Sequence, residues 1–142
     1  MTTYAHTQRA TLIIVMMIAA SAVFIIVGLA LCRPMLLAAP GLIVVGWLFH
    51  SLTIEVADDE LRWRFGPGLM GKRTRLNEIV SAQVVRTNVL EGWGVHYSRY
   101  GWLYNVSGFD AVAITLRDGK RFCLGTDEPE KLSAALLADK AV

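Results

Sequence analysis

The uncharged run TLIIVMMIAASAVFIIVGLALC, residues 11–32, decides the architecture of this chain. A helix of this length rises roughly 33 Å, which is enough to cross the hydrocarbon core of a bilayer. The run shows no polar face at helical spacing, so it is unlike a core helix of a soluble protein. We therefore predict a membrane-spanning helix over about residues 10–32.

A second apolar run, MLLAAPGLIVVGWLFHSLTI, follows at residues 35–54 and is interrupted by Pro40-Gly41. The backbone in lipid must satisfy its own hydrogen bonds, so we expect a second spanning helix over about 35–51. Pro40 either kinks this helix or begins its regular part. Because Arg33-Pro34 predicts a tight turn, the two helices should form an antiparallel hairpin with both chain ends on one side of the membrane.

The distribution of charge predicts which side that is. Arg9 precedes the first helix, further basic residues follow the second, and only Arg33 lies in the turn. The positive-inside rule then places both termini of a multi-pass membrane protein in the cytoplasm. A cleaved signal peptide and a lipoprotein are the alternatives. Both are disfavoured, because the apolar run continues beyond the Ala-rich residues 19–22 and because Leu31 precedes Cys32.

The composition separates an apolar first part from a charged second part. Hydrophobic residues make up 54% of the 142 residues and charged residues 18%, which is unusual for a soluble protein. All 12 acidic residues lie at Glu55 or beyond, and only Arg9 and Arg33 of the 14 basic residues precede it. The second part is therefore neutral, and we expect no nucleic-acid partner. Cys32 and Cys123 lie too far apart to suggest a disulfide framework or a metal site, and we expect no cofactor.

From residue 52 to residue 142 the sequence reads as a β-rich domain, and residues 1–9 read as a tail. Alternation and turn signals predict strands over residues 52–56, 61–65, 72–76, 79–86, 110–117 and 121–124, with one or two more within 89–109. Asp118-Gly119 is the strongest hairpin signal. A helix should follow over about 127–139, capped by Asp127 with Glu130 as a capping box. We predict an α+β fold: an antiparallel bent sheet of about seven strands with a C-terminal helix.

The order of these pieces resembles the pleckstrin-homology-like (PH-like) domains of small, uncharacterised bacterial membrane proteins. The matching segments are LRWRFG at 61–66, RLNEI at 75–79, LRDGKR at 116–121 and GTDEPEKL at 125–132, together with the aromatic stretch 92–108. In that family one or two helices usually precede the domain. The resemblance therefore implies a PH-like fold behind a helical anchor in a bacterial inner (plasma) membrane, and it implies no particular activity.

Basic residues alternate along two of the predicted strands and the loop between them. They are Arg62, Arg64, Lys72, Arg73 and Arg75. Such a face could bind a phosphate or an anionic headgroup. The domain follows the second helix with almost no linker, so this face should lie close to the bilayer. The alternative is a solvated strand face that keeps the domain soluble, and we favour it.

Aromatic residues with polar tips gather in the glycine-rich stretch of the domain. They are Trp93, Tyr97, Tyr100, Trp102 and Tyr104, with His96 among them. Such side chains favour membrane and protein interfaces, so this stretch could grip a partner or enter the headgroups. The alternative, of about equal weight, is that half of them fill the small core.

No pattern in the sequence indicates catalysis. His96, Ser98 and Asp110 contain the letters of a triad, but the serine has no Gly-x-Ser-x-Gly elbow. The chain also has no HExxH, CxxC, P-loop or GxGxxG motif. We predict a non-enzymatic interaction or scaffold module whose partners are the lipid bilayer and a membrane protein or a second copy. The alternative is a domain that binds an anionic lipid or a small ligand through the basic strand face.

Overall fold

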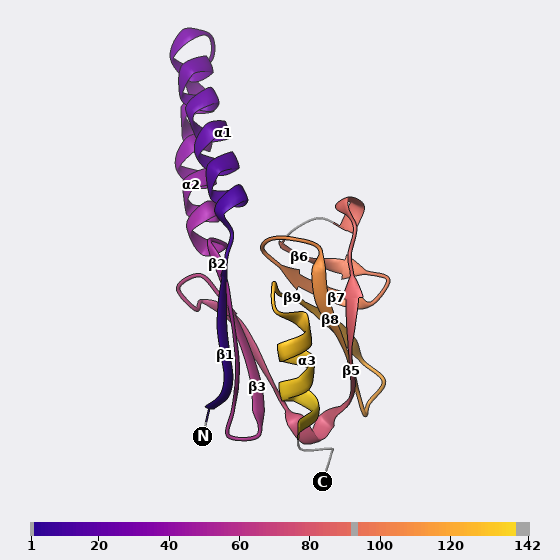
Figure 1. The fold of residues 1–142 in the computed structure, drawn as a ribbon. Helices are drawn as coiled ribbons and strands as arrows, with labels where there is room; N and C mark the ends of the chain where they lie inside the picture. Colours follow the sequence, from indigo (N-terminus) through magenta and orange to yellow (C-terminus); the bar gives the residue numbers. More distant parts are fainter. Residues whose placement is uncertain (1, 92–93, 139–142) are drawn as a thin grey trace.

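Two helices extend away from the β-domain, preceded and followed in sequence by a strand of that domain (Figure 1). The computed structural model describes residues 2–91 and 94–138. This segment of the chain runs through β1 (Thr2–Arg9), α1 (Thr11–Ala30), the 3-10 helix η1 (Arg33–Leu37), α2 (Ala38–Leu48) and β2 (Ser51–Ala57). Among the described residues, α1 alone is long and apolar enough to span a membrane, and the apolar segment Arg33–Leu48 is shorter.

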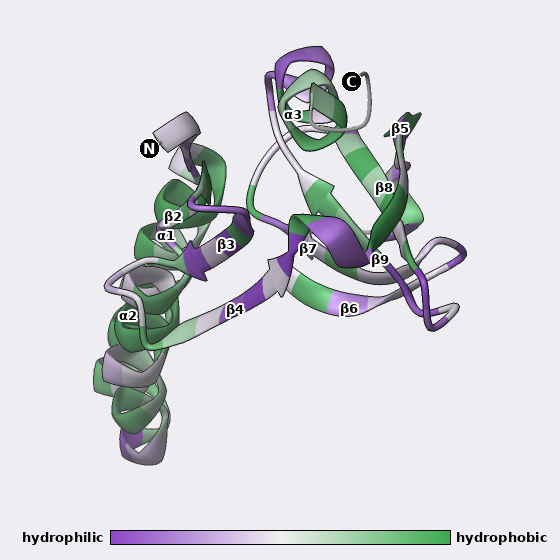
Figure 2. Ribbon diagram, turned by 90° about the horizontal axis from the view of Figure 1, so that it is seen from below, coloured by the Kyte–Doolittle hydropathy of each residue, from purple (hydrophilic) through white to green (hydrophobic). Residues whose placement is uncertain are grey.

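The helices α1 and α2 lie side by side because small residues line their contact (Figure 1). Ser21 and Gly28 of α1 and Gly46 of α2 are buried there. A Cβ atom added at Gly28 would come within 2.8 Å of the Leu36 side chain, so any larger residue there would displace Leu36. Pro40 lies in the first turn of α2, so it begins the regular part of that helix and does not kink it. Both helices are hydrophobic over most of their length (Figure 2).

The strand β1 corrects the prediction that residues 1–9 form a tail. β1 pairs antiparallel with β2, so that Tyr4 lies opposite Val56 and His6 lies opposite Ile54. The inward-facing residues of β1 include His6 and the buried Gln8, and their polarity hides the strand from a search for alternating hydrophobics. At the junction with the helices, the Ala10 amide donates to the His50 carbonyl at 2.8 Å.

The described residues form nine strands in two sheets, where a single antiparallel sheet of about seven was predicted. The first sheet has the order β1-β2-β3-β4, with β3 at Glu60–Phe65 and β4 at Met70–Arg75. The second has the order β5-β8-β9-β7-β6. Its strands are β5 (Ile79–Arg86), β6 (Gly94–Ser98), β7 (Gly101–Asn105), β8 (Asp110–Leu116) and β9 (Arg121–Gly125). β7 pairs parallel with β9, and sequence alternation contains no signal for such a pairing.

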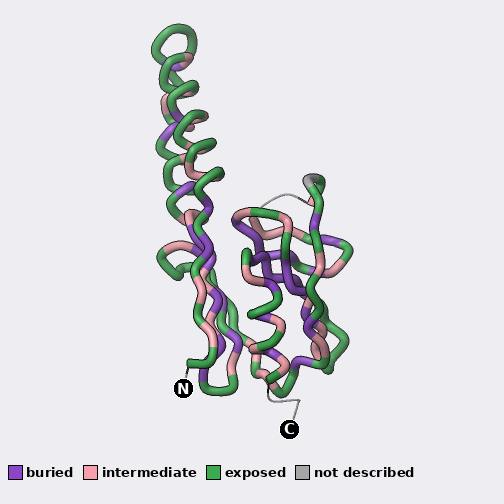
Figure 3. The backbone as a smooth tube through the Cα atoms, in the orientation of Figure 1, coloured by how far each residue is buried: buried purple, intermediate pink, exposed green. Residues whose placement is uncertain are grey.

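The core lies between the inner faces of the two sheets and the helix α3 (Pro129–Leu137), as the buried segments in Figure 3 show. Fully buried side chains include Leu52, Ile54, Leu61, Ile79, Ile114, Leu124, Leu132 and Leu136. Each such burial contributes about 1.5–3 kcal/mol relative to exposure.

The start of α3 differs from the predicted capping box. The helix begins at Pro129, and neither Asp127 nor Glu130 makes a cap. The Glu128 amide donates instead to the Thr126 hydroxyl at 3.1 Å. The Asp127 carboxylate lies 2.6 Å from His6 Nε2, so it joins α3 to β1 across the domain. Asp127, which the sequence predicts as a helix cap, therefore makes a tertiary contact with His6.

Candidate functional site

A cleft of about 1200 Å³ opens between the two sheets, where Lys72 of β4 approaches Tyr104 of β7. Its walls come from β3 and β4 of the first sheet, from the β6–β7 hairpin and from the β8–β9 hairpin. Six basic, two acidic and five aromatic side chains line it. The members are Trp63, Lys72, Arg73, Glu78, Tyr97, Arg99, Trp102, Tyr104, Arg117, Asp118, Lys120, Arg121 and Phe122.

Stacked aromatic rings close the inner end of the cleft. Trp63 stacks on Phe122 with ring centroids 4.8 Å apart and meets the edge of Tyr104 at 5.5 Å. This arrangement follows from the alternation in β3, which buries Leu61, Trp63 and Phe65 and exposes the arginines between them, as predicted. Trp63 is only 4% exposed, and its indole N–H has no partner among the described residues. A ligand in the cleft could accept that hydrogen bond.

The strand register divides the predicted basic cluster between two faces of the first sheet. Residues directly opposite in an antiparallel pair share a face. Lys72 lies opposite Trp63 and so belongs to the cleft side, where its Nζ lies 5.5 Å from the centre of the Tyr104 ring. Arg62 lies opposite Arg73, on the outer face. The five residues therefore do not form one surface.

The outer members of that cluster differ in what they contact. Arg62 is held by Glu60, with its Nη2 2.8 Å from the carboxylate, and this contact raises the pKa of Arg62. Arg64, Arg73 and Arg75 are exposed and make no ion pair with any residue in the described part of the chain. Arg73 belongs to the outer face by register but also reaches the rim of the cleft.

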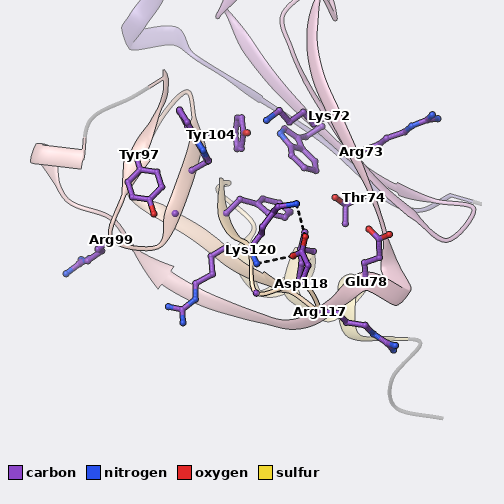
Figure 4. A pocket seen from close by; sticks show the side chains of 17 residues that line it. Lys72, Arg73, Thr74, Glu78, Tyr97, Arg99, Tyr104, Arg117, Asp118 and Lys120 are labelled. Carbon is purple, nitrogen blue, oxygen red and sulfur yellow. Dashed lines mark hydrogen bonds and ion pairs between the residues drawn. The ribbon is translucent and has the colours of Figure 1, made fainter.

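The β8–β9 turn supplies basic residues that sequence reasoning had assigned only to a hairpin. Lys120 Nζ lies 2.8 Å from the Asp118 carboxylate, which lowers the pKa of Asp118 and raises that of Lys120. Figure 4 shows Lys72 and Lys120 extending into the cleft from opposite walls, and Arg73 and Arg117 pointing outward at its rim. Lys72, Arg73, Arg117 and Arg121 form no ion pair within residues 2–91 and 94–138. The sequence signal for these residues is the basic flank of Asp118-Gly119, formed by Arg117, Lys120 and Arg121.

The predicted aromatic group also separates. Tyr97 and Trp102 form an edge-to-face pair across β6 and β7, with centroids 5.9 Å apart, and are 74% and 49% exposed at the cleft. Tyr104 is buried in the core. Tyr100 packs in a smaller cluster on the outer face of the second sheet, beneath the Arg99 guanidinium at 4.9 Å. Trp93 lies outside the described residues.

Of the three residues that resemble a triad, Ser98 and Asp110 have structural partners, whereas the buried His96 Nε2 has no hydrogen-bond partner among the described residues. The Ser98 hydroxyl donates to the Gly101 carbonyl at 3.0 Å and accepts from the Tyr100 amide at 3.1 Å, which shapes the β6–β7 turn. Asp110 lies 4.0 Å from Arg86 Nε. Within the described ranges, no group of three or more His, Cys, Asp or Glu side chains could hold a metal ion. The chemistry that the cleft offers is attraction of anions together with contact to apolar groups.

No protein-family model, no curated protein and no solved structure matches this chain. What the protein does must therefore be argued from two features of its own: the basic and aromatic cleft, and the apolar helices that continue from β1 and β2.

Proposed function

We propose that this protein is a membrane-anchored, non-enzymatic interaction module whose cleft binds an anionic partner at the cytoplasmic face of a bacterial inner membrane. One observation carries the proposal. A single cleft combines unpaired basic side chains with exposed aromatic rings, in a domain joined without a linker to an apolar helix. Aromatic and arginine side chains are the residues that dominate protein-binding surfaces.

The anchor would be a hairpin made by α1 and α2. Only 11% of the most apolar window of α1 is buried, so the domain itself does not cover this helix. If α1 crosses the bilayer, the chain must return, because β2 pairs with β1 from residue 51 to residue 57. The segment 33–48 rises about 26 Å as five 3-10 and eleven α-helical residues. That is slightly short of a typical hydrocarbon core, and local thinning of the bilayer would accommodate the difference.

Two alternatives for α1 fit the geometry less well. Cleavage of the first helix as a signal would also remove β1, which is an edge strand of the first sheet and contacts α3 through His6. A buried core helix would need a partner over the exposed apolar side chains of α1, among them Ile18, Ile26 and Leu29. Lipid provides that environment directly.

The position of the cleft favours a soluble partner over a lipid headgroup. The Arg117 amide donates to the Glu78 carbonyl at 2.8 Å, so the β8–β9 turn lies beside the 3-10 helix η2 (Leu76–Glu78). Figure 1 shows this end of the domain opposite α1 and α2. The basic turn of the cleft would therefore face the aqueous phase.

The PH-like identity belongs to the same proposal. Two packed sheets closed by a C-terminal helix support it, as does the helical segment before the domain. The parallel pair of β7 and β9 departs from the antiparallel sheet expected of that fold. The identity would account for the architecture, and the binding proposal does not depend on it.

A second candidate function is attraction of anionic lipid to the outer face of the first sheet. Arg64, Arg73 and Arg75 favour it, because they are exposed and form no ion pair in the described chain. Each basic residue near an anionic surface contributes about 1 kcal/mol. Glu55 and Glu60 share this face by register and oppose the effect.

The test compares two pairs of charge reversals in the full-length protein, held in nanodiscs of neutral phosphatidylcholine. The probe is fluorescein-labelled poly-glutamate, measured by anisotropy. We expect Lys72→Glu/Arg121→Glu to weaken binding by about tenfold or more, because both reversals act in the cleft. The matched control, Arg62→Glu/Arg64→Glu, should bind within about twofold of wild type, because its reversals lie on the outer face of β3 and away from the edge of β4.

Equal losses in the two variants, or no binding by wild type, would contradict the cleft as the site. A parallel measurement uses nanodiscs that contain phosphatidylglycerol. Closer approach of the domain to the surface of these discs, lost only in Arg64→Glu/Arg75→Glu, would support attraction of anionic lipid to the outer face of the first sheet.

A further inference from the structure

We propose that the partner is an extended peptide segment with alternating acidic and apolar residues, which adds to the open edge of β4 as a fifth strand of the first sheet. This inference rests on the proposed binding function of the cleft and names the class of ligand. Three features of the described structure carry it: the unpaired edge of β4, the place of that edge in the cleft, and the chemistry on either side of it.

The edge of β4 presents free backbone groups. Within the described residues, β4 is the last strand of its sheet and pairs only with β3. The Leu76 amide donates to the Asp59 carbonyl at 2.8 Å, so these two opposite residues form a hydrogen-bonded pair. Hydrogen-bonded and non-hydrogen-bonded pairs alternate along an antiparallel ladder. The backbone groups of residues 72 and 74 therefore bond to β3, and the backbone N–H and C=O groups of residues 71, 73 and 75 point away from it. Such an edge is a template for another strand.

The free edge of β4 forms one wall of the cleft. Lys72, Arg73 and Thr74 are consecutive residues of β4, and all three line it. Figure 4 shows these residues on one side, with Tyr97 and the β8–β9 turn across from them. A strand paired with residues 71–75 would therefore occupy the cleft instead of extending into solvent.

The two sides of an added strand would meet different surfaces. Neighbouring strands share their alternation, so every second side chain of the peptide would lie on the face of Lys72 and Trp63. There it would contact Tyr97, Trp102 and the ring of Phe122, which favour apolar groups. The other side chains would lie on the face of Arg73 and Arg75, which favour carboxylates. The pattern of the ligand follows from the period of a β-strand.

A peptide fits these features better than other anions. A nucleic acid offers phosphates and bases, but it has no backbone that pairs with a strand edge. A lipid headgroup would have to reach a cleft whose basic turn lies at the end of the domain opposite the helices (Figure 1). A free small anion would use the lysines and leave the edge and the exposed Tyr97–Trp102 pair without a role.

The experiment separates the backbone of β4 from its charge. The full-length protein in phosphatidylcholine nanodiscs is titrated against a fluorescein-labelled alternating Glu-Val peptide of about nine residues. Arg73→Pro removes both the arginine and an outward-pointing amide, whereas Arg73→Ala removes the arginine alone. We expect Arg73→Pro to bind about tenfold more weakly than Arg73→Ala, because a strand-to-strand hydrogen bond is lost and the edge is blocked.

Two further probes do not depend on a protein variant. Two versions of the same peptide are N-methylated at every second residue, one at the odd and one at the even positions. One version should lose binding and the other should retain it, because only one edge of the peptide strand pairs with β4. A block peptide of equal composition should bind more weakly, because its valines and glutamates cannot separate onto two faces. Melting curves of both Arg73 variants check that the domain remains folded.

The possible failures are distinct. If poly-glutamate and all peptides bind alike, and Arg73→Pro equals Arg73→Ala, then strand addition is wrong while the anion-binding cleft stands. If none of these probes binds, both strand addition and the proposed anion-binding function of the cleft are wrong. Stronger binding of an RNA oligonucleotide or of phosphatidylglycerol vesicles, lost in Lys72→Glu/Arg121→Glu, would overturn the peptide in favour of that partner.

Discussion

At the scale of single residues, strand register decides which basic side chains can act together. The sequence places Arg62, Arg64 and Lys72 in one basic cluster, but the pairing of Lys72 with Trp63 turns this lysine into the cleft. Alternation within β3 was readable from the sequence, whereas the register between β3 and β4 depends on the turn at Gly66 and Gly68. A cluster of like residues in sequence therefore predicts a surface only once the register is known.

Gly101 is a residue on which both the fold and the cleft depend. Its φ is +94°, and a Cβ atom would collide with the carbonyl oxygen of Arg121 in the neighbouring strand. We expect Gly101→Ala to lower the free energy of unfolding by about 3 kcal/mol or more and to weaken binding to the cleft.

The matched control is Gly119→Ala. Gly119 also has a positive φ, +83°, but no atom lies within 4 Å of the added methyl group. This variant should lose only about 1 kcal/mol, for the backbone conformation. Urea unfolding measures both variants, and equal costs would show that β7 and β9 do not approach as closely as described.

The thiol of Cys123 should be protected by the fold. The side chain is fully buried, and burial raises the pKa of the thiol from 9.0 to about 12, with a further contribution from Glu91. At pH 8 the folded protein should therefore react with iodoacetamide at Cys32 and not at Cys123, and unfolding should expose both.

The same shift makes stability depend on pH. Between about pH 9 and pH 12 the unfolded thiol ionises while the folded thiol stays protonated, so stability should fall as the pH rises through this window. In Cys123→Ser this part of the pH dependence should be absent. Rapid alkylation of native Cys123 at pH 8 would contradict its burial.

At the scale of elements, the sequence predicts what local periodicity encodes. The apolar run identifies α1, and β5 has the bounds 79–86 that alternation and turn residues predict. β1 was missed because its inward positions carry Tyr4, His6 and Gln8. The parallel pair of β7 and β9 was missed because it joins residues far apart in sequence through the close approach at Gly101. Such contacts are tertiary and leave no periodic signal.

The contact between α1 and α2 can be tested with two glycines of one helix. Gly46 faces Met17, and a Cβ atom there would lie 3.2 Å from the Met17 Cβ, whereas no atom lies within 4 Å of a Cβ at Gly41. We expect Gly46→Leu to separate the helices and to lower the melting temperature in nanodiscs by several degrees.

Gly41→Leu is the control and should be neutral or slightly stabilising, because leucine has a higher helix propensity than glycine. Differential scanning calorimetry of both variants measures the difference. If Gly41→Leu were the more damaging substitution, the outer face of α2 would be a contact with another protein or a second copy.

At the scale of the whole molecule, the pairing of β1 with β2 couples the apolar helices to the cleft. The two helices emerge from neighbouring strands of one sheet, and the Ala10–His50 hydrogen bond ties the two junctions together. Phe49 beside α2 packs against Phe65 of β3 at 5.3 Å, which fixes the domain against the base of the helices. If the helices span a bilayer as proposed, the cleft would therefore be held at a set height and orientation above it, with its basic turn open to the aqueous phase.

The most direct test of the proposed membrane anchor is to determine on which side of the membrane each end of the proposed hairpin lies. Cys32 is exposed in the turn after α1, and β1 can carry a second label as Thr3→Cys in a Cys32→Ser background. A membrane-impermeant maleimide is applied to intact spheroplasts that express each form. With both chain ends in the cytoplasm, Cys32 should react from outside and Thr3→Cys should react only after lysis. Reaction of Thr3→Cys from outside, with Cys32 protected until lysis, would contradict a cleft that faces the cytoplasm.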